Sequence, residues 1–212
     1  MIVVMAMPQI APQEFLARPF RVHAFLSDVP LHDVWAVDLP AVPGEATLQE
    51  FNRRVKIRNL AGKISWPARA LLGLRLFLGR IFGWDKEPKR DRRRYFAERL
   101  TPEDRERSSV PAGTPDRFFR VVYSFENEML LEVINRTVHA ALLSALVPMP
   151  IGYRFYFGVY VCELSWITRP YMALIGPFRK CLVYPALLEQ VRQSWERVFL
   201  READETSRVK ER

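Results

Sequence analysis

The sequence predicts an α+β fold in which an antiparallel sheet packs against one long C-terminal helix. Between residues 118 and 165, four segments of alternating side chains follow one another with short turns between them. Residues 171–199 then show the longest apolar helical pattern in the chain. The segment before this helix, 153–165, is rich in aromatic side chains. We therefore expect this strand and this helix to form the frame of the fold.

Length and composition favour one domain. The chain has 212 residues, of which 49% are hydrophobic, which is enough for one good core and short for two. The net charge is +8, but the basic residues between 86 and 107 are interleaved with acidic ones. This stretch, part of a charged insert at about 85–115, is therefore interpreted as a solvated mixed-charge loop, with a polyanion-binding arm as the alternative. We expect no specific nucleic-acid partner.

The chain has the features of a cytoplasmic protein that does not span a membrane. Cys162 and Cys181 show no CxxC spacing, so neither a disulfide framework nor a zinc site is expected. The apolar start lacks a basic region, and Pro8 and Pro12 interrupt it. No run of 18 apolar residues occurs. No cofactor is implied by any motif.

Residues 1–30 carry four prolines without a clear period and are expected to form an extended N-terminal leader. The next segment, 32–39, alternates as a strand. Asp33 and Trp35 fall on one side of it, whereas His32 and Asp38 fall on the other. Because the alternation separates these potential ligands, no metal site is expected there.

Two helices should follow the first strand. Thr47 can cap a short amphipathic helix that reaches Val55, with Glu50 completing a capping box. A second helix is predicted over 67–82, and it is apolar over most of its circumference. Such a helix must be covered on two sides, by the sheet and by another segment or a partner.

The four alternating segments predict strands at 118–125, 128–135, 138–147 and 153–165, linked as an antiparallel meander. In the C-terminal helix, Pro185 removes a backbone donor, which predicts a kink or a short break near Tyr184. A single domain is thus expected over 31–199, followed by a disordered tail at 200–212.

Three short stretches of the C-terminal region carry a resemblance to a known family. They are Tyr171-Met172-Ala173-Leu174-Ile175, Pro177-Phe178-Arg179 and Val183-Tyr184-Pro185-Ala186-Leu187-Leu188, and they resemble the closing-helix signature of the DUF2867 family. This family has no known function and is related to the START-like proteins of the SRPBCC superfamily. The resemblance extends over about 32–197. It implies a helix-grip fold, in which a curved sheet wraps the last helix and leaves a cavity between them.

Two departures from the family pattern limit what the resemblance implies. Several members carry His-Leu-Asp-Phe after the second meander turn, where this chain has Thr137-Val138-His139-Ala140. Some members are also fused to a nucleotide-binding reductase domain, so the resemblance implies a reductase partner. This chain has no GxGxxG motif of its own.

A cavity between the sheet and the helix would be lined by large side chains with a few polar groups. The alternative is that these side chains simply fill the core. The residues expected to contact a ligand are Trp35, Phe77, Tyr123, Tyr156, Tyr160, Tyr171, Ile175 and Phe178.

His139 and Glu132 are the candidate catalytic residues. His139 lies inside a predicted strand and is suited to proton transfer near neutral pH, although a single histidine is more often structural. Glu132 shares a strand face with apolar residues and would be costly to bury without a partner. An ion pair with Arg120, Arg136 or Arg154 on a solvent face is therefore expected, and the alternative is an acid that faces the cavity and orients a ligand or transfers a proton.

Three functions therefore remain open on the sequence. The first is a binding module for a small hydrophobic molecule in a START-like cavity. The second is an enzyme of the cyclase, dehydratase or isomerase type, acting on an apolar substrate through His139 or Glu132. The third is a peripheral membrane or protein-interaction role for the charged insert and the apolar helix at 67–82.

Overall fold

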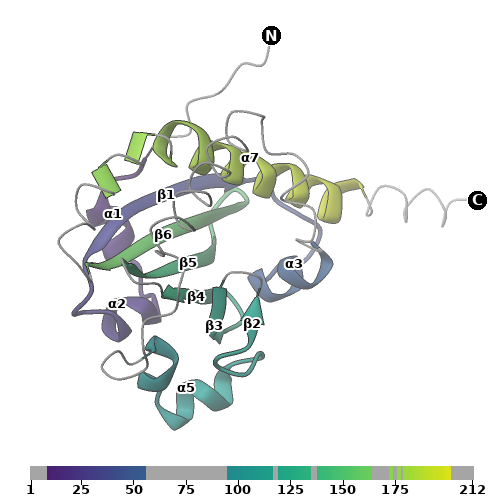
Figure 1. The fold of residues 1–212 in the computed structure, drawn as a ribbon. Helices are drawn as coiled ribbons and strands as arrows, with labels where there is room; N and C mark the ends of the chain where they lie inside the picture. Colours follow the sequence, from purple (N-terminus) through teal and green to yellow (C-terminus); the bar gives the residue numbers. More distant parts are fainter. Residues whose placement is uncertain are drawn as a thin grey trace, which may run out of the picture.

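The chain folds into one six-stranded antiparallel sheet with helices on both faces (Figure 1). The computed structural model describes residues 9–55, 95–116, 119–134, 138–163, 172–173, 176–177 and 179–201. The strand order is β1-β6-β5-β4-β3-β2. The predicted α+β class, antiparallel meander and C-terminal helix are thus confirmed.

Consecutive strands pair from β2 to β6, and β1 joins the sheet on the other side of β6. Trp35 of β1 lies opposite Phe157 of β6, so both side chains project to the same face. The pairing of β3 with β4 is interrupted by an irregularity between Val121 and Tyr123. The strands are β1 (Leu31–Leu39), β2 (Pro115–Asp116), β3 (Phe119–Ser124), β4 (Glu128–Ile134), β5 (Val138–Pro148) and β6 (Tyr153–Glu163).

The turn between β5 and β6 depends on Gly152. This residue has a φ of 85°, and a Cβ placed on it would lie 2.3 Å from the carbonyl oxygen of Leu39. Only glycine fits such a position without strain. The turn can therefore fold back against the end of β1.

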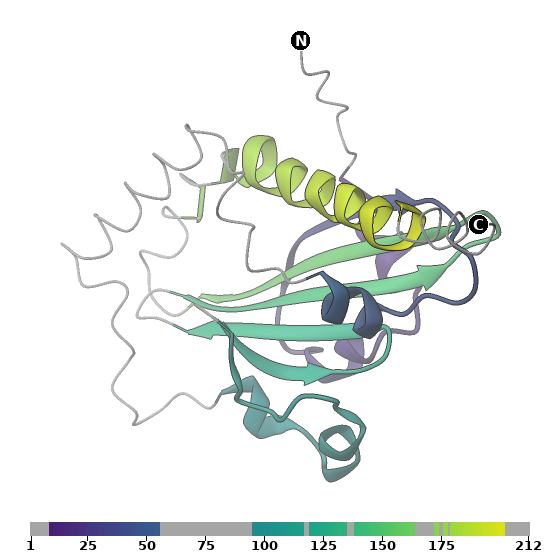
Figure 2. The same cartoon turned by 90° about the vertical axis from the view of Figure 1, so that its right-hand side faces the viewer.

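The C-terminal helix and α3 (Leu48–Arg54) cover one face of the sheet (Figure 2). The helix consists of a π-helical turn η3 (Arg179–Val183), α7 (Tyr184–Trp195) and a second π-helical turn η4 (Glu196–Arg201). Pro185 lies in the first turn of α7, where its missing N–H costs little. The change of helix type at Tyr184 agrees with the predicted irregularity there.

The core on this side lies between the sheet and the paired α3 and α7. Trp195 is fully buried, packs on Phe51 and Tyr153, and donates a hydrogen bond from Nε1 to the Pro40 carbonyl at 3.0 Å. Thr47 caps α3 as predicted, because its hydroxyl accepts the N–H of Glu50. The back half of the C-terminal helix is thus firmly packed.

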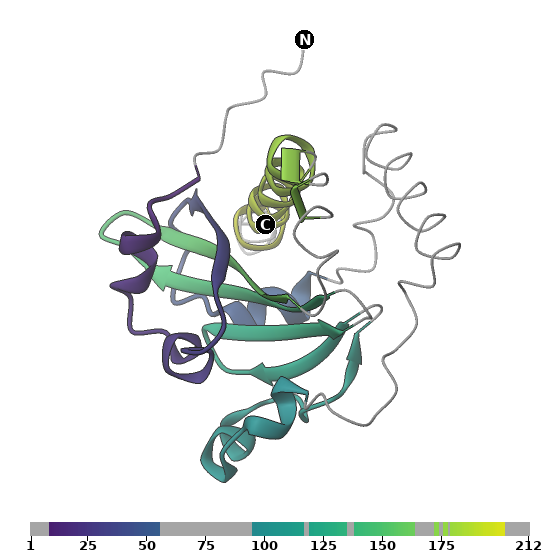
Figure 3. The ribbon, with the colours of Figure 1, turned by 60° about the vertical axis from the view of Figure 1, so that its left-hand side comes forward.

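The opposite face is covered by the N-terminal segment and by part of the charged insert (Figure 3). The covering helices are α1 (Pro12–Leu16), α2 (Arg21–Phe25) and the 3-10 helix η2 (Phe96–Arg99), and α5 (Pro102–Arg107) is linked to α2 by the Arg21–Asp104 ion pair. Both sides of the sheet therefore carry a core.

Two predictions about these covering segments are wrong. Residues 9–30 do not form an extended leader, because they fold into two helices that bury Phe15, Val22 and Leu26 against the sheet. The described part of the charged insert is not a solvated loop either, since Phe96 and Leu100 are buried in the same core.

Several predictions fall outside the described residues: the helix at 67–82, residues 85–94 of the insert, and the tail beyond 201. Within the described part of the chain, no helix combines the length and the apolar character needed to cross a membrane.

Candidate functional site

One corner of the interface between the sheet and the C-terminal helix combines aromatic rings with a buried charge cluster. β1 supplies its acidic group and an indole, β6 a phenyl ring, and the start of the C-terminal helix two cations and a phenol. We call it the Asp33 corner, and it consists of His32, Asp33, Trp35, Phe157, Arg179, Lys180 and Tyr184.

The aromatic part of the corner is built around Tyr184. Its ring centroid lies 5.5 Å from that of Trp35 and 5.7 Å from that of Phe157. All three side chains are more than nine-tenths buried. Alternation along β1 and β6 directs the indole and the phenyl ring toward the helix, and α7 begins where its first side chain meets them.

The charged part is centred on Asp33, whose side chain is completely buried. The Lys180 ammonium lies 3.1 Å from Oδ1 without the alignment of a hydrogen bond, and Nη2 of Arg179 lies 3.8 Å from Oδ2. His32 Nδ1 lies 3.5 Å from Oδ2, while its Nε2 lies 3.4 Å from Arg179 Nη2.

Arg179 links the charged and aromatic parts. Its Nη1 donates a hydrogen bond to the Tyr184 hydroxyl at 3.1 Å. Burial raises the pKa of Tyr184 to about 12, and the charge of Asp33 acts in the same direction, whereas Arg179 opposes the shift. The phenol is therefore neutral at physiological pH and serves as a polar group at the edge of an apolar wall.

The corner also contains unsatisfied polar atoms. Among the described residues, the buried side-chain nitrogens and oxygens without a hydrogen-bond partner are both carboxylate oxygens of Asp33, Nε1 of Trp35 and Nε of Arg179. All of them belong to this one place. Since buried polar groups in folded proteins are normally hydrogen-bonded, such a concentration requires an explanation.

The two candidate catalytic residues lie on the other face of the sheet. His139 Nε2 and Glu132 Oε2 are 2.9 Å apart, and Glu132 is only 1% exposed. The same carboxylate accepts the N–H groups of Phe96 at 2.7 Å and Ala97 at 3.2 Å, and the Phe96 ring stacks on the imidazole at 3.7 Å. The expected position of Glu132 on a solvent face is wrong, because the start of η2 covers it.

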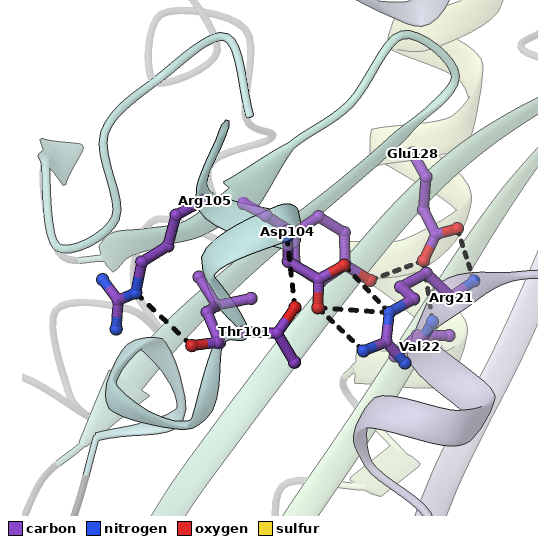
Figure 4. Close-up of polar contacts among 8 residues, drawn as sticks. Arg21, Val22, Thr101, Asp104, Arg105 and Glu128 are labelled. Atoms are coloured by element: carbon purple, nitrogen blue, oxygen red, sulfur yellow. Dashed lines mark hydrogen bonds and ion pairs between the residues drawn. The ribbon is translucent and has the colours of Figure 1, made fainter. Parts of the chain in front are cut away.

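A second buried glutamate has the same arrangement. Glu128 accepts the N–H groups of Arg21 at 2.8 Å and Val22 at 2.9 Å, as well as the Tyr123 hydroxyl. Burial, reinforced by the negative charge of Glu128, holds the pKa of Tyr123 well above its ordinary value. Figure 4 shows the Arg21 side chain reaching onward to Asp104 of α5, with Nη2 2.7 Å from Oδ2. These contacts hold the covering helices on the sheet and present no unpaired group.

The predicted ligand-contacting residues do not form one site. Trp35 lies in the Asp33 corner, whereas Tyr123, Tyr156 and Tyr160 belong to the core on the opposite face. They cannot line a cavity between the sheet and the C-terminal helix. The remaining predicted contacts, Phe77, Tyr171, Ile175 and Phe178, lie outside the described residues.

Sequence reasoning missed the charged members of the corner. The alternation of β1 did place Asp33 on the same side as Trp35, and a carboxylate on an apolar strand face is a signal of a functional group. Arg179 and Lys180 interrupt the apolar helical pattern in the same way. What the sequence did not indicate is that these three charges meet. Asp38 points away and pairs with Arg154.

The described residues contain no group of three or more His, Cys, Asp or Glu side chains placed to hold a metal ion. The Asp33 corner has one carboxylate and one imidazole facing two cations, a donor set that suits an organic ligand better than a metal.

Comparison with known proteins gives one match. Neither the curated proteins nor the solved structures contain a match to this chain. A family model does match, over residues 25–186, which includes every member of the Asp33 corner and most of the 212 residues. On that match, the chain belongs to the family described as "Protein of unknown function (DUF2867)".

Proposed function

We propose that this protein binds a small hydrophobic molecule between the sheet and the start of the C-terminal helix, in the manner of START-like proteins. The observation that carries the proposal is the concentration of unsatisfied buried polar atoms in the Asp33 corner, beside three aromatic rings. An apolar wall with a few converging polar groups is the usual composition of a small-molecule site. Membership of DUF2867 and a sheet closed by a C-terminal helix support the helix-grip interpretation.

The position of the site follows from which parts of the interface between the sheet and the C-terminal helix are already filled by side chains. Toward Trp195 and Phe199, side chains of α3, α7 and η4 occupy the interface. The polar atoms that lack partners lie at the other end, around Asp33 and Trp35. The proposed ligand therefore occupies the end of the interface near η3, with its polar group among the unpartnered polar atoms of the Asp33 corner and its apolar part against the rings.

No comparable observation in the described residues favours the enzyme interpretation. The carboxylate of Glu132 already accepts three hydrogen bonds, two of them from the backbone, and Phe96 covers the His139 ring. The membrane or protein-interaction interpretation rests on the helix at 67–82, which lies outside the described residues.

The test is native mass spectrometry of the purified protein under gentle ionisation, with solvent extraction of co-purifying molecules. Two matched variants sharpen it. Tyr184→Phe removes the hydroxyl that Arg179 contacts in the corner, and Tyr156→Phe removes a hydroxyl on the opposite face, where it contacts Arg18. We expect an apolar adduct on the wild type and on Tyr156→Phe, and about three- to tenfold weaker retention on Tyr184→Phe.

The absence of any apolar adduct from wild-type protein, together with no binding of added apolar probes, overturns the proposal. Equal loss of the adduct in both tyrosine variants would place the site elsewhere and overturn its assignment to the Asp33 corner. Circular dichroism of all three proteins separates loss of binding from loss of folding.

A further inference from the structure

We infer that the polar end of the bound molecule is a carboxylate, so that the ligand is an apolar monocarboxylic acid. This inference rests on the proposed function, because it names the class of ligand for the same site. It is argued from the charge balance of the Asp33 corner, from its unpartnered donors and from the shape of its apolar wall.

The corner carries one positive charge in excess. Asp33 contributes one negative charge, whereas Arg179 and Lys180, whose side chain is 42% exposed, contribute two positive charges. Lys180 is the nearer cation to the carboxylate, at 3.1 Å, and Arg179 is at 3.8 Å. The Arg179 side chain is only 15% exposed, so its charge is largely shielded from water and incompletely balanced. A buried charge without a full partner is costly, and one additional anion would balance it.

The unpartnered donors require an acceptor. Nε1–H of Trp35 and Nε–H of Arg179 are both buried and without a hydrogen-bond partner among the described residues. Neither group can accept a hydrogen bond, so a ligand must bring lone pairs to them. The two oxygens of a carboxylate provide acceptors for both donors and match the planar geometry of a guanidinium.

The other head groups fit less well. A quaternary or primary ammonium would add a third positive charge beside Arg179 and offers no acceptor. An alcohol offers one oxygen and leaves the excess charge unbalanced. A phosphate dianion would make the corner net negative next to Asp33, whose side chain is completely buried. A single negative charge shared by two oxygens is the best complement.

The apolar part of the ligand follows from the rings. The Tyr184 ring contacts the rings of both Trp35 and Phe157, so three aromatic side chains lie next to the charges. Such a wall favours an extended alkyl or aryl body and offers no groups for a sugar or a peptide.

The test compares matched probes by isothermal titration: decanoate, decanol and decyltrimethylammonium, each below its micelle concentration. We expect decanoate to bind about tenfold more tightly than decanol, since it gains charge-assisted hydrogen bonds, and decyltrimethylammonium to bind most weakly. Arg179→Gln should reduce decanoate binding to about the level of decanol, and Arg179→Lys should restore part of the preference.

The control is Arg192→Gln on the outward side of α7, where Arg192 pairs with Glu189 and Glu196. It should keep the full preference for decanoate. If the acid and the alcohol bind equally well, the carboxylate inference fails while the proposed function stands. If none of the three probes binds, both fail. If Arg179→Gln does not fold, Trp35→Phe takes its place in the comparison of decanoate with decanol. This variant removes the indole donor and keeps an aromatic ring.

Discussion

Glu128 and Glu132 of β4 accept hydrogen bonds from the first N–H groups of α2 and η2, respectively. These N–H groups have no partner within their own helix, and leaving one of them buried and unpaired costs about 1–3 kcal/mol. A charged side chain in the middle of a strand is thus explained by the two short helices that pack over it. The same contacts account for the burial of His139 beside Glu132.

The Asp104–Arg21 pair should make stability depend on pH. The hydrogen bonds from Arg21 hold the pKa of Asp104 below its ordinary value. A lowered pKa in the folded state stabilises the protein above the unfolded-state pKa of about 4, and this contribution disappears as the pH falls through the folded-state pKa. We expect Asp104→Asn to lower the free energy of unfolding by about 1.5 kcal/mol at pH 7 and by progressively less below pH 4.

Urea unfolding of wild type and Asp104→Asn between pH 3 and 7 measures this difference. Glu126→Gln, at an exposed position of the β3–β4 turn, is the control and should show no such pH-dependent difference. A difference that stays constant over the whole pH range would contradict the role assigned to the pair.

The sequence drew attention to Glu132 and His139 for a valid reason, because both occupy strand positions that are costly for polar groups. It could not show what covers them. The covering residues, Phe96 and Ala97, belong to the charged insert, whose alternating charges suggested a solvated loop. Charge composition describes a segment on average, whereas the described part of the insert buries Phe96, Ala97 and Leu100 and exposes every charged side chain except Asp104.

The helix α1 packs on β6 at a glycine, where the strand has no side chain. Phe15 is completely buried and lies over Gly158, where a Cβ would come within 3.2 Å of Cζ of the phenyl ring. A strand glycine is normally a weak point, but here it lets an aromatic ring approach the sheet. The close contact fixes α1 on the strand that also carries Phe157 on its other face.

A double-mutant cycle tests this contact. Phe15→Ala should cost about 3–5 kcal/mol, and Gly158→Ala about 1–2 kcal/mol, since the added methyl forces the ring outward. In the Phe15→Ala background, Gly158→Ala should become nearly neutral, because the ring that it would clash with is gone. Thermal and urea unfolding measure all four proteins. Additive losses would show that the two positions do not interact.

The strands were predictable because alternation extends over several residues, and five of the six agree with the sequence pattern. The two-residue β2 was not recognised, since it is too short to show alternation. The helices α1 and α2 were missed for a similar reason, because each has five residues and shows no period. Helices this short are stabilised by packing against the sheet rather than by their own sequence.

Because helices cover both faces of the sheet, a ligand site between the sheet and the C-terminal helix can use only the side chains on one of those faces. Alternation along β1 correctly placed Trp35 on the opposite face from Val34 and Ala36. It could not show which face of β6 meets the C-terminal helix. Both faces of β6 are aromatic, with Phe155 and Phe157 on one and Tyr156 and Tyr160 on the other. The tyrosines therefore looked suitable for a cavity, although the N-terminal segment covers them.

Removal of residues 1–29 should therefore unfold the protein and not leave a shorter folded domain. The deletion uncovers Tyr156 and Tyr160 and leaves Glu128 without the N–H groups of Arg21 and Val22. We expect loss of the cooperative unfolding transition and strong binding of the dye ANS. Deletion of residues 1–8 alone, which keeps these contacts, is the control. A cooperative transition that survives the longer deletion would contradict this role of the segment.

The pairing of β1 with β6 has a consequence for how the chain is made. Leu31 pairs with Tyr160, about 130 residues later, and at about 5–20 residues per second a ribosome needs on the order of ten seconds to cover that distance. Throughout this time Phe15, Val22 and Trp35 have no sheet to pack on. The meander from β3 to β6 is local and can assemble as soon as it emerges. The N-terminal helices and β1 are therefore synthesised before the strands on which they pack, and their apolar side chains need protection from aggregation until β6 emerges.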